Sequence, residues 1–446
     1  MGNQPHVLVI PFPAQGHVMP LMKLSCCLVD RGFKVTFVNT EFVHARVIAA
    51  LPEKVNVLDQ IDLVSIPDGV TGEDRDDHCK LLDSISNTMP GKLEKLIRNI
   101  GETIACVIAD TSVGWALELA KNMGIRTAAF FPACAGAQAL SLSIPKLIQA
   151  DVIDSNGTPK KNMTITLSPS MPTVNTADFL WNSFGNLSLQ HKVFHSILRY
   201  NEISKLADWF VCNSFNELEP AGINLVPNLL PIGPLLPSNQ LGHLWREDST
   251  CLNWLSQQAP GSVIYVAFGS FTIFNENQFH ELALGLQLLG RPFLWVVRLD
   301  VTGGLGPTYP DGFQDRVAHL GKIVDWAPQQ KVLAHPSIAC FLTHCGWNST
   351  IEGVSMGVPL ICWPYFADQF FNRSYITDVW RVGLELNPDE TEIVRRDEIK
   401  EKVDQLLGDK VMKENSLRLK DMAIHSVAKD GSSWKNMEKF VEGMIS

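Results

Sequence analysis

The sequence of 446 residues lacks the cysteine spacing that marks zinc sites, redox motifs or disulfide frameworks. Its ten cysteines include no CxxC pair and are scattered through apolar runs, two of them adjacent at Cys26 and Cys27. Buried free thiols are the expected role of such residues. Acidic and histidine side chains form no cluster that suggests a divalent ion. We therefore expect neither a metal site nor another cofactor.

Long hydrophobic runs are absent as well. No stretch of about 18 apolar residues occurs, the length that a membrane-spanning helix needs. The N-terminal segment MGNQPHVLVIPFP has no basic region, and Pro11 and Pro13 interrupt its apolar run early. This segment indicates a strand rather than a signal peptide. We expect a cytoplasmic protein without a membrane span.

The sequence also has fewer basic than acidic residues. Lysine and arginine number 37 against 47 acidic residues, which gives a net charge of −10. Nucleic acids and anionic membranes need clustered positive charge, so neither is an expected partner. Phosphate binding stays open, because helix N-termini bind phosphate without basic side chains. The hydrophobic content of 46% is typical of a globular protein, and the length predicts two or three domains.

What the sequence does contain is an α/β pattern that occurs twice. Short apolar runs alternate with helical patterns, which is typical of βαβ units in a parallel sheet. In the first half, strands are predicted at 7–10, 35–38, 106–109, 127–131 and 209–213. In the second half, they are predicted at 263–268, 293–297, 322–324, 340–343 and 360–362. A helix predicted over 19–31 ends at Gly32, a good C-cap.

A stretch rich in proline separates the two halves. Its prolines are Pro227, Pro231, Pro234 and Pro237, and polar residues follow to about Ser249. Such a composition suits a stiff interdomain linker. We expect an N-terminal domain at 1–237, a linker at 238–249, a C-terminal domain at 250–428, and a final helix at 429–446 that packs back on the N-terminal domain. Another irregular region, at 156–186, is either a functional loop or a plain surface insertion.

The most informative segment, WAPQQKVLAHPSIACFLTHCGWNSTIEGVSMGVPLICWPYFADQ, occupies residues 326–369. A predicted strand leads into a turn of small and polar residues that starts at His344. Asn348 or Ser349 is expected to cap a short helix that ends at Gly357. Open α/β sheets bind ligands where a strand ends and a helix begins, and the helix dipole favours phosphate there. No Walker lysine and no GxGxxG occurs, so the usual nucleotide fingerprints are absent.

This segment resembles the signature box of plant secondary-product glycosyltransferases, UDP-sugar-dependent enzymes of family 1. It has the full length of the box and agrees at nearly every fixed position. PFPAQGH at 11–17, FGS at 268–270 and GSS at 431–433 also stand where that family has them. Ala339 replaces a common Gly, which adds one methyl group that a strand should tolerate, and Lys429-Asp430 replaces a more usual Glu-Gly away from the chemistry. The resemblance implies an α/β fold of the GT-B type, two facing Rossmann-like domains with a cleft between them.

The resemblance also implies roles in binding the sugar nucleotide. Uracil would stack on Trp326 and pair with the Ala327 backbone, and the ribose would bind Gln329 and Glu352. The diphosphate would bind His344, Asn348, Ser349, Ser270 and the amides of Gly346 and Trp347. The glucose hydroxyls would contact Trp347, Asp368 and Gln369. In this family a final Gln accompanies glucose, so Gln369 favours UDP-glucose over UDP-galactose.

A histidine and an aspartate in the first half suit transfer to a hydroxyl group, which must lose its proton as it attacks. His17 lies between the first predicted strand and the helix after it, and Asp110 ends another strand. Parallel strands would bring both side chains to one edge, where Asp110 orients the imidazole that acts as base. Similar enzymes use such a pair and invert the anomeric centre. Taken alone, His17 could instead be a neighbour of the helix cap and Asp110 a turn residue.

The resemblance also implies that the acceptor binds mainly to the N-terminal domain. Residues that could line its site are Phe12, Phe131, Trp181, Phe184, Leu187 and Phe366. Such a lining implies a flavonoid, another phenolic, a terpenoid or a lipophilic hormone as acceptor and a β-O-glucoside as product. Any of these side chains could instead belong to the hydrophobic core. We expect the enzyme to be a monomer.

Other functions fit less well. A Rossmann oxidoreductase needs a glycine fingerprint after its first strand, and a His–Asp hydrolase needs a GxSxG elbow. Neither motif is present. The alternatives that stay open are the use of another UDP-sugar and an inactive relative that only binds ligands.

Overall fold

The computed structural model describes residues 4–51, 60–71, 78–237, 244–303 and 306–446. The chain divides into two compact units. Unit 1 comprises Met1–Ser168, Val174–Arg246 and His425–Ser446, and unit 2 comprises Pro169–Thr173 and Glu247–Ile424. The division at Arg246 falls within the expected linker, whose residues 238–243 lie outside the described part of the chain.

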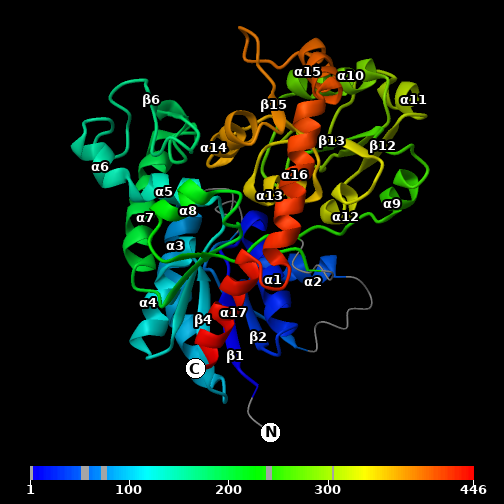
Figure 1. The fold of residues 1–446 in the computed structure, drawn as a ribbon. Helices are drawn as coiled ribbons and strands as arrows, with labels where there is room; N and C mark the ends of the chain where they lie inside the picture. Colours follow the sequence, from blue (N-terminus) through cyan, green and yellow to red (C-terminus); the bar gives the residue numbers. More distant parts are fainter. Residues whose placement is uncertain (1–3, 52–59, 72–77, 238–243, 304–305) are drawn as a thin grey trace. The chain divides into compact units, whose positions relative to one another are not determined.

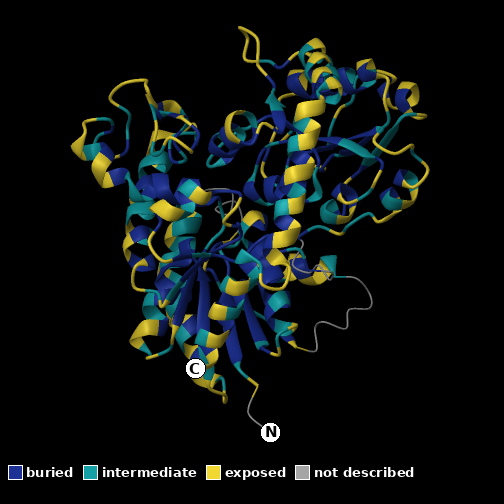
Figure 2. Ribbon diagram, in the orientation of Figure 1, coloured by how far each residue is buried: buried dark blue, intermediate teal, exposed yellow. Residues whose placement is uncertain are grey.

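Unit 1 is built on a parallel sheet with the strand order β3-β2-β1-β4-β5-β8-β9. Figure 1 labels its strands β1, β2 and β4. The strands are β1 (His6–Ile10), β2 (Lys34–Thr40), β3 (Ile61–Ile66), β4 (Ile104–Asp110), β5 (Thr127–Phe131), β8 (Trp209–Cys212) and β9 (Leu229–Pro231). The five strands predicted in this half are confirmed, and β3 and β9 are additional strands at the two edges. Central strands such as β1 are buried along their whole length, as Figure 2 shows in dark blue.

Helices pack around this sheet. They are α1 (Gln15–Val29), α2 (Glu41–Ala50), α3 (His78–Asn99), α4 (Trp115–Asn122), α5 (Ala135–Leu142), α6 (Ile144–Gln149), α7 (Leu187–Ser204), α8 (Pro220–Leu225) and α17 (Ser432–Ile445). Helix α1 starts four residues earlier than predicted, so His17 lies in its first turn, and Gly32 lies in the turn before β2. Region 156–186 is largely irregular but contains the antiparallel pair β6 (Thr164–Ile165) and β7 (Val174–Asn175).

Helix α17 completes the core of unit 1, although it comes from the end of the chain. Met437, Phe440, Val441 and Met444 are buried in the same cluster as the side chains of β1 and α1. The helix contacts β4 and β9, and Figure 1 shows it in red beside the strands. Apolar residues three or four apart form the stripe that a helix needs to pack on a sheet.

A buried carboxyl group joins two helices of unit 1. Glu219 is fully buried just before α8, and its two oxygens accept hydrogen bonds from the backbone amides of Ala135 (3.2 Å) and Gly136 (3.1 Å). The hydroxyl of Ser214 donates a third bond, at 2.6 Å. Because Ala135 and Gly136 begin α5, Glu219 satisfies amides that the helix itself leaves without partners.

Unit 2 is built on a second parallel sheet, ordered β12-β11-β10-β13-β14-β15. The strands are β10 (Val263–Ala267), β11 (Phe293–Val296), β12 (Gly321–Val324), β13 (Ile338–Thr343), β14 (Leu360–Cys362) and β15 (Gly383–Glu385). The helices are α9 (Thr250–Leu255), α10 (Glu276–Leu289), α11 (Phe313–Val317), α12 (Gln329–Leu333), α13 (Trp347–Met356), α14 (Gln369–Ser374), α15 (Arg396–Gly408) and α16 (Lys410–Val427). The five strands predicted in this half are confirmed, and β15 is an additional edge strand. Among the described residues, no helix has both the length and the apolar character needed to cross a membrane.

The two sheets share one topological feature. In unit 1 the strand order reverses between β1 and β4, and in unit 2 it reverses between β10 and β13. The connections that leave these paired strands go to opposite sides, which opens a crevice at their carboxyl ends. The residues that follow β1, β4, β10 and β13 are therefore the first candidates for a functional site.

Candidate active site

His17 and Asp110 meet at the reversal point of unit 1. Asp110 is the last residue of β4, and His17 follows β1 through the turn that begins α1. His17 Nδ1 lies 2.8 Å from Asp110 Oδ2. The aspartate is 0% exposed, whereas the histidine remains partly exposed. The other carboxylate oxygen of Asp110 accepts a bond from the Ser112 amide at 2.7 Å, so the carboxylate is fixed on both sides.

This geometry selects one form of the imidazole. A carboxylate only accepts, so Nδ1 of His17 carries the proton and donates it to Asp110. The other ring nitrogen, Nε2, then keeps its lone pair and is able to take a proton. The ring of Phe12 packs against the imidazole with 5.1 Å between centroids. The pair has the chemistry of a general base with its orienting acid.

In unit 2 the helix α13 begins directly after the turn that follows β13. Its N-cap is Gly346, with no side-chain cap, so the prediction that Asn348 or Ser349 caps this helix is wrong. Both residues lie inside the first turn instead, and the helix ends before Gly357 as predicted. The first amides of a helix have no partner within it and carry the positive end of its dipole. The start of α13 is therefore suited to an anion.

The two residues with a predicted ribose role are hydrogen-bonded to each other. The Gln329 amide nitrogen donates to Glu352 Oε2 at 2.8 Å and to Ser349 Oγ at 3.0 Å. The hydroxyl of Tyr265 donates to Gln329 Oε1 at 3.3 Å. Burial raises the pKa of Tyr265 well above its usual value, which keeps the hydroxyl protonated as a donor. Tyr265 is a member of this network that sequence reasoning missed, because it belongs to the strand β10 and looks like a core residue.

His344 is held between two glycines. A Cβ atom on Gly269 would lie 2.6 Å from His344 Nε2, and one on Gly346 would lie 2.4 Å from the same atom. Gly269 also has a φ of +67°, which favours glycine. Burial, together with the positive charge of Arg298, lowers the pKa of His344 to about 4. The ring is therefore neutral near pH 7, and its Nδ1 has no hydrogen-bond partner within the described chain.

The end of the box is a rigid turn. Gln369 Oε1 accepts bonds from the amides of Tyr365 (2.8 Å) and Phe366 (3.2 Å), so the amide nitrogen of Gln369 is the group that remains to donate to a ligand. The Asn372 amide nitrogen donates to Asp368 Oδ2 at 2.8 Å and to the Cys345 carbonyl at 2.9 Å. Asn372 thus connects the residues with a predicted sugar role to the turn after β13, a connection that the sequence alone did not show.

The other residues with a predicted donor role also lie at this edge of unit 2. Trp326 is half-buried after β12, and its carbonyl accepts a bond from the Asp248 amide at 2.9 Å. Ala327 is buried next to it, and Ser270 is half-buried in the turn after β10. The ring of Trp347 is buried and lies 6.4 Å from that of Trp380.

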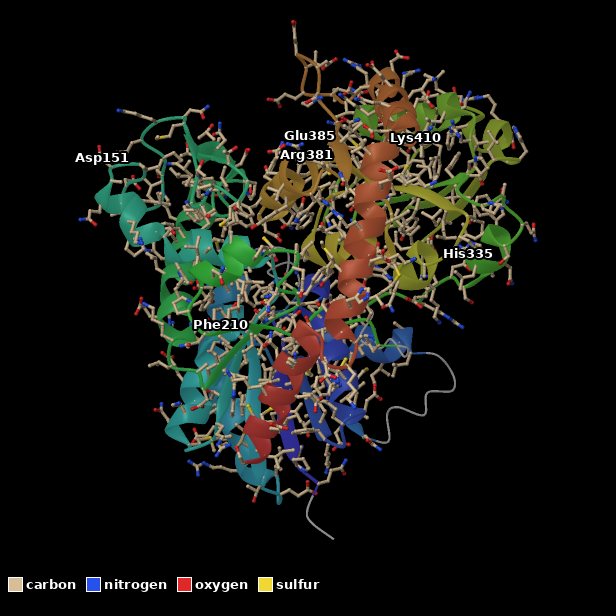
Figure 3. All side chains as sticks on the ribbon, in the orientation of Figure 1. Asp151, Phe210, His335, Arg381, Glu385 and Lys410 are labelled. Atoms are coloured by element: carbon tan, nitrogen blue, oxygen red, sulfur yellow. The ribbon has the colours of Figure 1, made fainter. Side chains whose placement is uncertain are left out.

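The residues proposed for the acceptor are placed less uniformly. In unit 1, Phe12 and Phe184 are half-buried, Leu187 is exposed at the start of α7, and Phe131 packs edge-on against Phe210, which Figure 3 labels. In unit 2, Phe366 is half-buried and packs edge-on against Phe271.

The structure corrects the expectation for Trp181. Its ring is 0% exposed and packs between Phe179 and Phe194, with centroid distances of 4.9 and 5.4 Å. Its indole N–H donates to the Gly157 carbonyl at 2.8 Å. A side chain so enclosed belongs to the core and has no surface left for an acceptor.

Comparisons with known proteins place the chain in a family. The sequence model described as UDP-glucoronosyl and UDP-glucosyl transferase matches residues 6–430. UDP-glycosyltransferase 83A1 of Arabidopsis thaliana is 46% identical, over 100% of this chain and 97% of its own length. The 7-deoxyloganetin glucosyltransferase of Catharanthus roseus is 34% identical, over 100% of this chain and 97% of its own. Phytolacca americana UGT2, solved in complex with UDP-2fluoro-glucose and pterostilbene, is 27% identical with a TM-score of 0.80, over 99% of this chain and 100% of that structure.

The sequence match and the structural match both extend over nearly the whole chain. The two parallel α/β sheets agree with the GT-B architecture of the solved relatives. The protein belongs to the UDP-glycosyltransferase family of plants and is a UDP-glycosyltransferase of the GT-B fold.

Proposed function

We propose that this enzyme transfers glucose from UDP-glucose to a hydroxyl group of a small apolar acceptor, with inversion, to give a β-O-glucoside. The observation that carries the proposal is the 2.8 Å contact between His17 and the fully buried Asp110 at the reversal point of unit 1. A ligand-binding relative without activity would have no need for a base that a buried carboxylate orients.

The proposed reaction is a single displacement. The acceptor hydroxyl attacks the anomeric carbon of glucose while its proton passes to His17 Nε2. The bond from that carbon to the β-phosphate oxygen breaks, and UDP leaves with the electron pair. Asp110 stabilises the imidazolium that forms, and the amides at the start of α13 stabilise the negative charge on UDP. Attack from the side opposite to the leaving group converts the α-linked sugar of the donor into a β-glucoside.

The choice of glucose rests on the turn around Gln369. Because Gln369 Oε1 is occupied by two backbone amides, its amide nitrogen donates, and Asp368, held by Asn372, accepts. A donor and an acceptor fixed side by side recognise a particular pair of sugar hydroxyls and reject sugars that leave these groups unpaired. We propose that the recognised sugar is glucose.

The acceptor is proposed to be a flavonoid, another phenolic, a terpenoid alcohol or a lipophilic hormone. Half-buried aromatic side chains at the same edge of unit 1 as His17 support this, with Phe12 in contact with the imidazole itself. The names of two relatives also support a small organic acceptor. One is named as a 7-deoxyloganetin glucosyltransferase, and another was solved in complex with pterostilbene.

The test is an assay of glucoside formation and UDP release. Purified enzyme is screened with UDP-glucose against a panel of phenolics and terpenoid alcohols, and kcat/KM for the best acceptor is then compared for UDP-glucose, UDP-galactose and UDP-glucuronate. We expect the highest value for UDP-glucose, by tenfold or more, the usual scale for unpaired polar groups in a site. A preference for either other donor would contradict the glucose assignment. UDP binding without turnover on any acceptor would indicate an inactive relative.

Activity is further expected to be independent of divalent metals. In the described part of the chain, no three His, Cys, Asp or Glu side chains are grouped so that they could hold an ion. The helix start and the neutral His344 are proposed to serve the diphosphate in its place. Turnover should persist after exhaustive treatment with EDTA. A loss that Mg²⁺ or Mn²⁺ restores would show that an ion takes part.

A further inference from the structure

Arg298 is a buried arginine close to the residues with a predicted phosphate role. It follows β11 and is 3% exposed. Its Nη1 donates to the Gly269 carbonyl, and its Nη2 donates to the Thr272 carbonyl at 2.9 Å. Its Nε donates to Asp300 Oδ1 at 2.8 Å. All three nitrogens of the guanidinium group are therefore engaged at once.

The two carbonyls that Arg298 binds belong to Gly269 and Thr272, and Ser270 lies between these residues in the sequence. This residue lies in the turn between β10 and α10, where the backbone at Gly269 has the left-handed φ of +67°. The far end of the turn is held by a bond from the Phe274 amide to the Val301 carbonyl, at 2.7 Å. The near end lies against His344, with no room for a Cβ on Gly269. The guanidinium group thus holds the turn through the carbonyls of Gly269 and Thr272, while His344 packs against Gly269.

Arg298 also places a positive charge at this edge of unit 2. Its carboxylate partner, Asp300, is 64% exposed, so water screens the negative charge more than the buried positive one. Besides burial, Arg298 lowers the pKa of His344, which lies two residues before Gly346, the N-cap of α13. A planar guanidinium group provides both this charge and a rigid fork of donors, whereas lysine provides only the charge.

We infer that Arg298 is a positioning residue for the diphosphate of the donor. It holds residues 269–272 so that Ser270 and the neighbouring amides meet the phosphates, and it adds fixed positive charge behind them. This inference rests on the proposed binding of a UDP-sugar by unit 2. It adds a residue to the donor site that lies outside the signature box.

The test compares two ligands that differ only in the diphosphate, the group that Arg298 is proposed to affect. Binding of UDP and of uridine is measured by titration calorimetry for the wild type and for Arg298→Lys. We expect the Kd of UDP to rise tenfold or more, because a lysine cannot bind both carbonyls and Asp300 together. The Kd of uridine should stay within about twofold, since the residues proposed to bind it, Trp326, Gln329 and Glu352, lie outside the turn at 269–272. Arg316→Lys is the matched control, because the exposed Arg316 makes comparable bonds to Gln287 and the Asp311 carbonyl, and its replacement should leave both values unchanged.

A second variant keeps the test decisive if Arg298→Lys fails to fold. Asp300→Asn changes an exposed side chain and weakens the bond to Nε. It also removes a negative charge, but water already screens that charge, so we expect the loss of orientation to dominate, with a rise in Kd of about two- to fivefold for UDP and none for uridine. Equal weakening of UDP and uridine, or no weakening of either, would overturn the inference. If the wild type fails to bind UDP, the donor proposal itself is wrong and this inference fails with it. If the wild type binds UDP and both variants match it, only the role of Arg298 is refuted.

Discussion

Replacing His17 with alanine is expected to lower kcat by roughly 10²–10⁴-fold, the usual scale for loss of a general base. The affinity for UDP should hardly change, because all residues with a proposed donor role belong to unit 2 and His17 belongs to unit 1. Steady-state kinetics with an aliphatic alcohol acceptor and calorimetry with UDP measure the two effects separately. His195→Ala is the control, since this exposed histidine of α7 contacts Asn156 and should leave kcat near that of the wild type.

Asp110 should behave as part of the same unit. Asp110→Asn keeps a side chain of the same shape but removes the charge that stabilises the imidazolium, so we expect a large loss of kcat that is smaller than that of His17→Ala. The double variant should lose far less than the product of the two single effects. A phenol that is already partly ionised should be less sensitive to either change than an alcohol. Near-normal turnover of an alcohol by His17→Ala would refute the proposed mechanism while leaving the donor proposal intact.

The stability of the protein is expected to fall between pH 5 and pH 8 because of Glu219. The pKa of this carboxyl group is raised to about 7, because the effect of burial exceeds that of the hydrogen bonds from Ser214 and the two amides of α5, which lower the pKa. The folded protein therefore binds more protons than the unfolded chain between about pH 4.5 and 7, so its stability decreases as the pH rises through that range. A shift of this size corresponds to about 3 kcal/mol, or a change in Tm of roughly 5–10 °C for a unit of this size.

Glu219→Gln removes the titration and isolates this effect. The variant should be less stable than the wild type at pH 5. Glutamine replaces one of the two accepting carboxyl oxygens with an NH₂ group, which cannot accept a bond from the donors around it. The difference in Tm between the two proteins should shrink as the pH rises to 8. Glu217→Gln is the matched control, since Glu217 is exposed two residues earlier and accepts a bond from Ser432. Parallel pH profiles for the wild type and Glu219→Gln would contradict the prediction.

The sequence predicted the central strands of both sheets and the edge strand β12, but it missed the edge strands β3, β9 and β15. Strands such as β1 and β10 are covered on both faces and have continuous apolar runs, the strongest signal a parallel strand gives. The edge strand β3 contains Asp62 and Ser65, because part of it faces water, and β9 and β15 are only three residues long. Such segments resemble loops in composition. Tertiary pairing with a neighbouring strand is what makes them strands.

The same contrast holds for the candidate site. His17 and Asp110 were predictable because each follows a central strand, and the topology of a parallel sheet brings such positions together. Arg298 was not predictable, because its partners are backbone carbonyls 26 and 29 residues away and any residue can supply a carbonyl. Trp181 shows a different limit of prediction from sequence, because a residue that looked like part of a binding site belongs to the core. Its residue type suits both a binding site and a core, and only its packing decides between them.

The return of the chain to unit 1 at His425 has a consequence for how enzymes of this kind can be recombined. A chimera that exchanges everything after the linker would also import a foreign α17, whose four apolar side chains would have to fit a core that they did not evolve with. The natural module for exchanging donor specificity is instead the internal segment 247–424, grafted at two junctions. Such a graft would exchange the proposed donor residues together with Phe366, while the proposed base His17 and its partner Asp110 stay with the host.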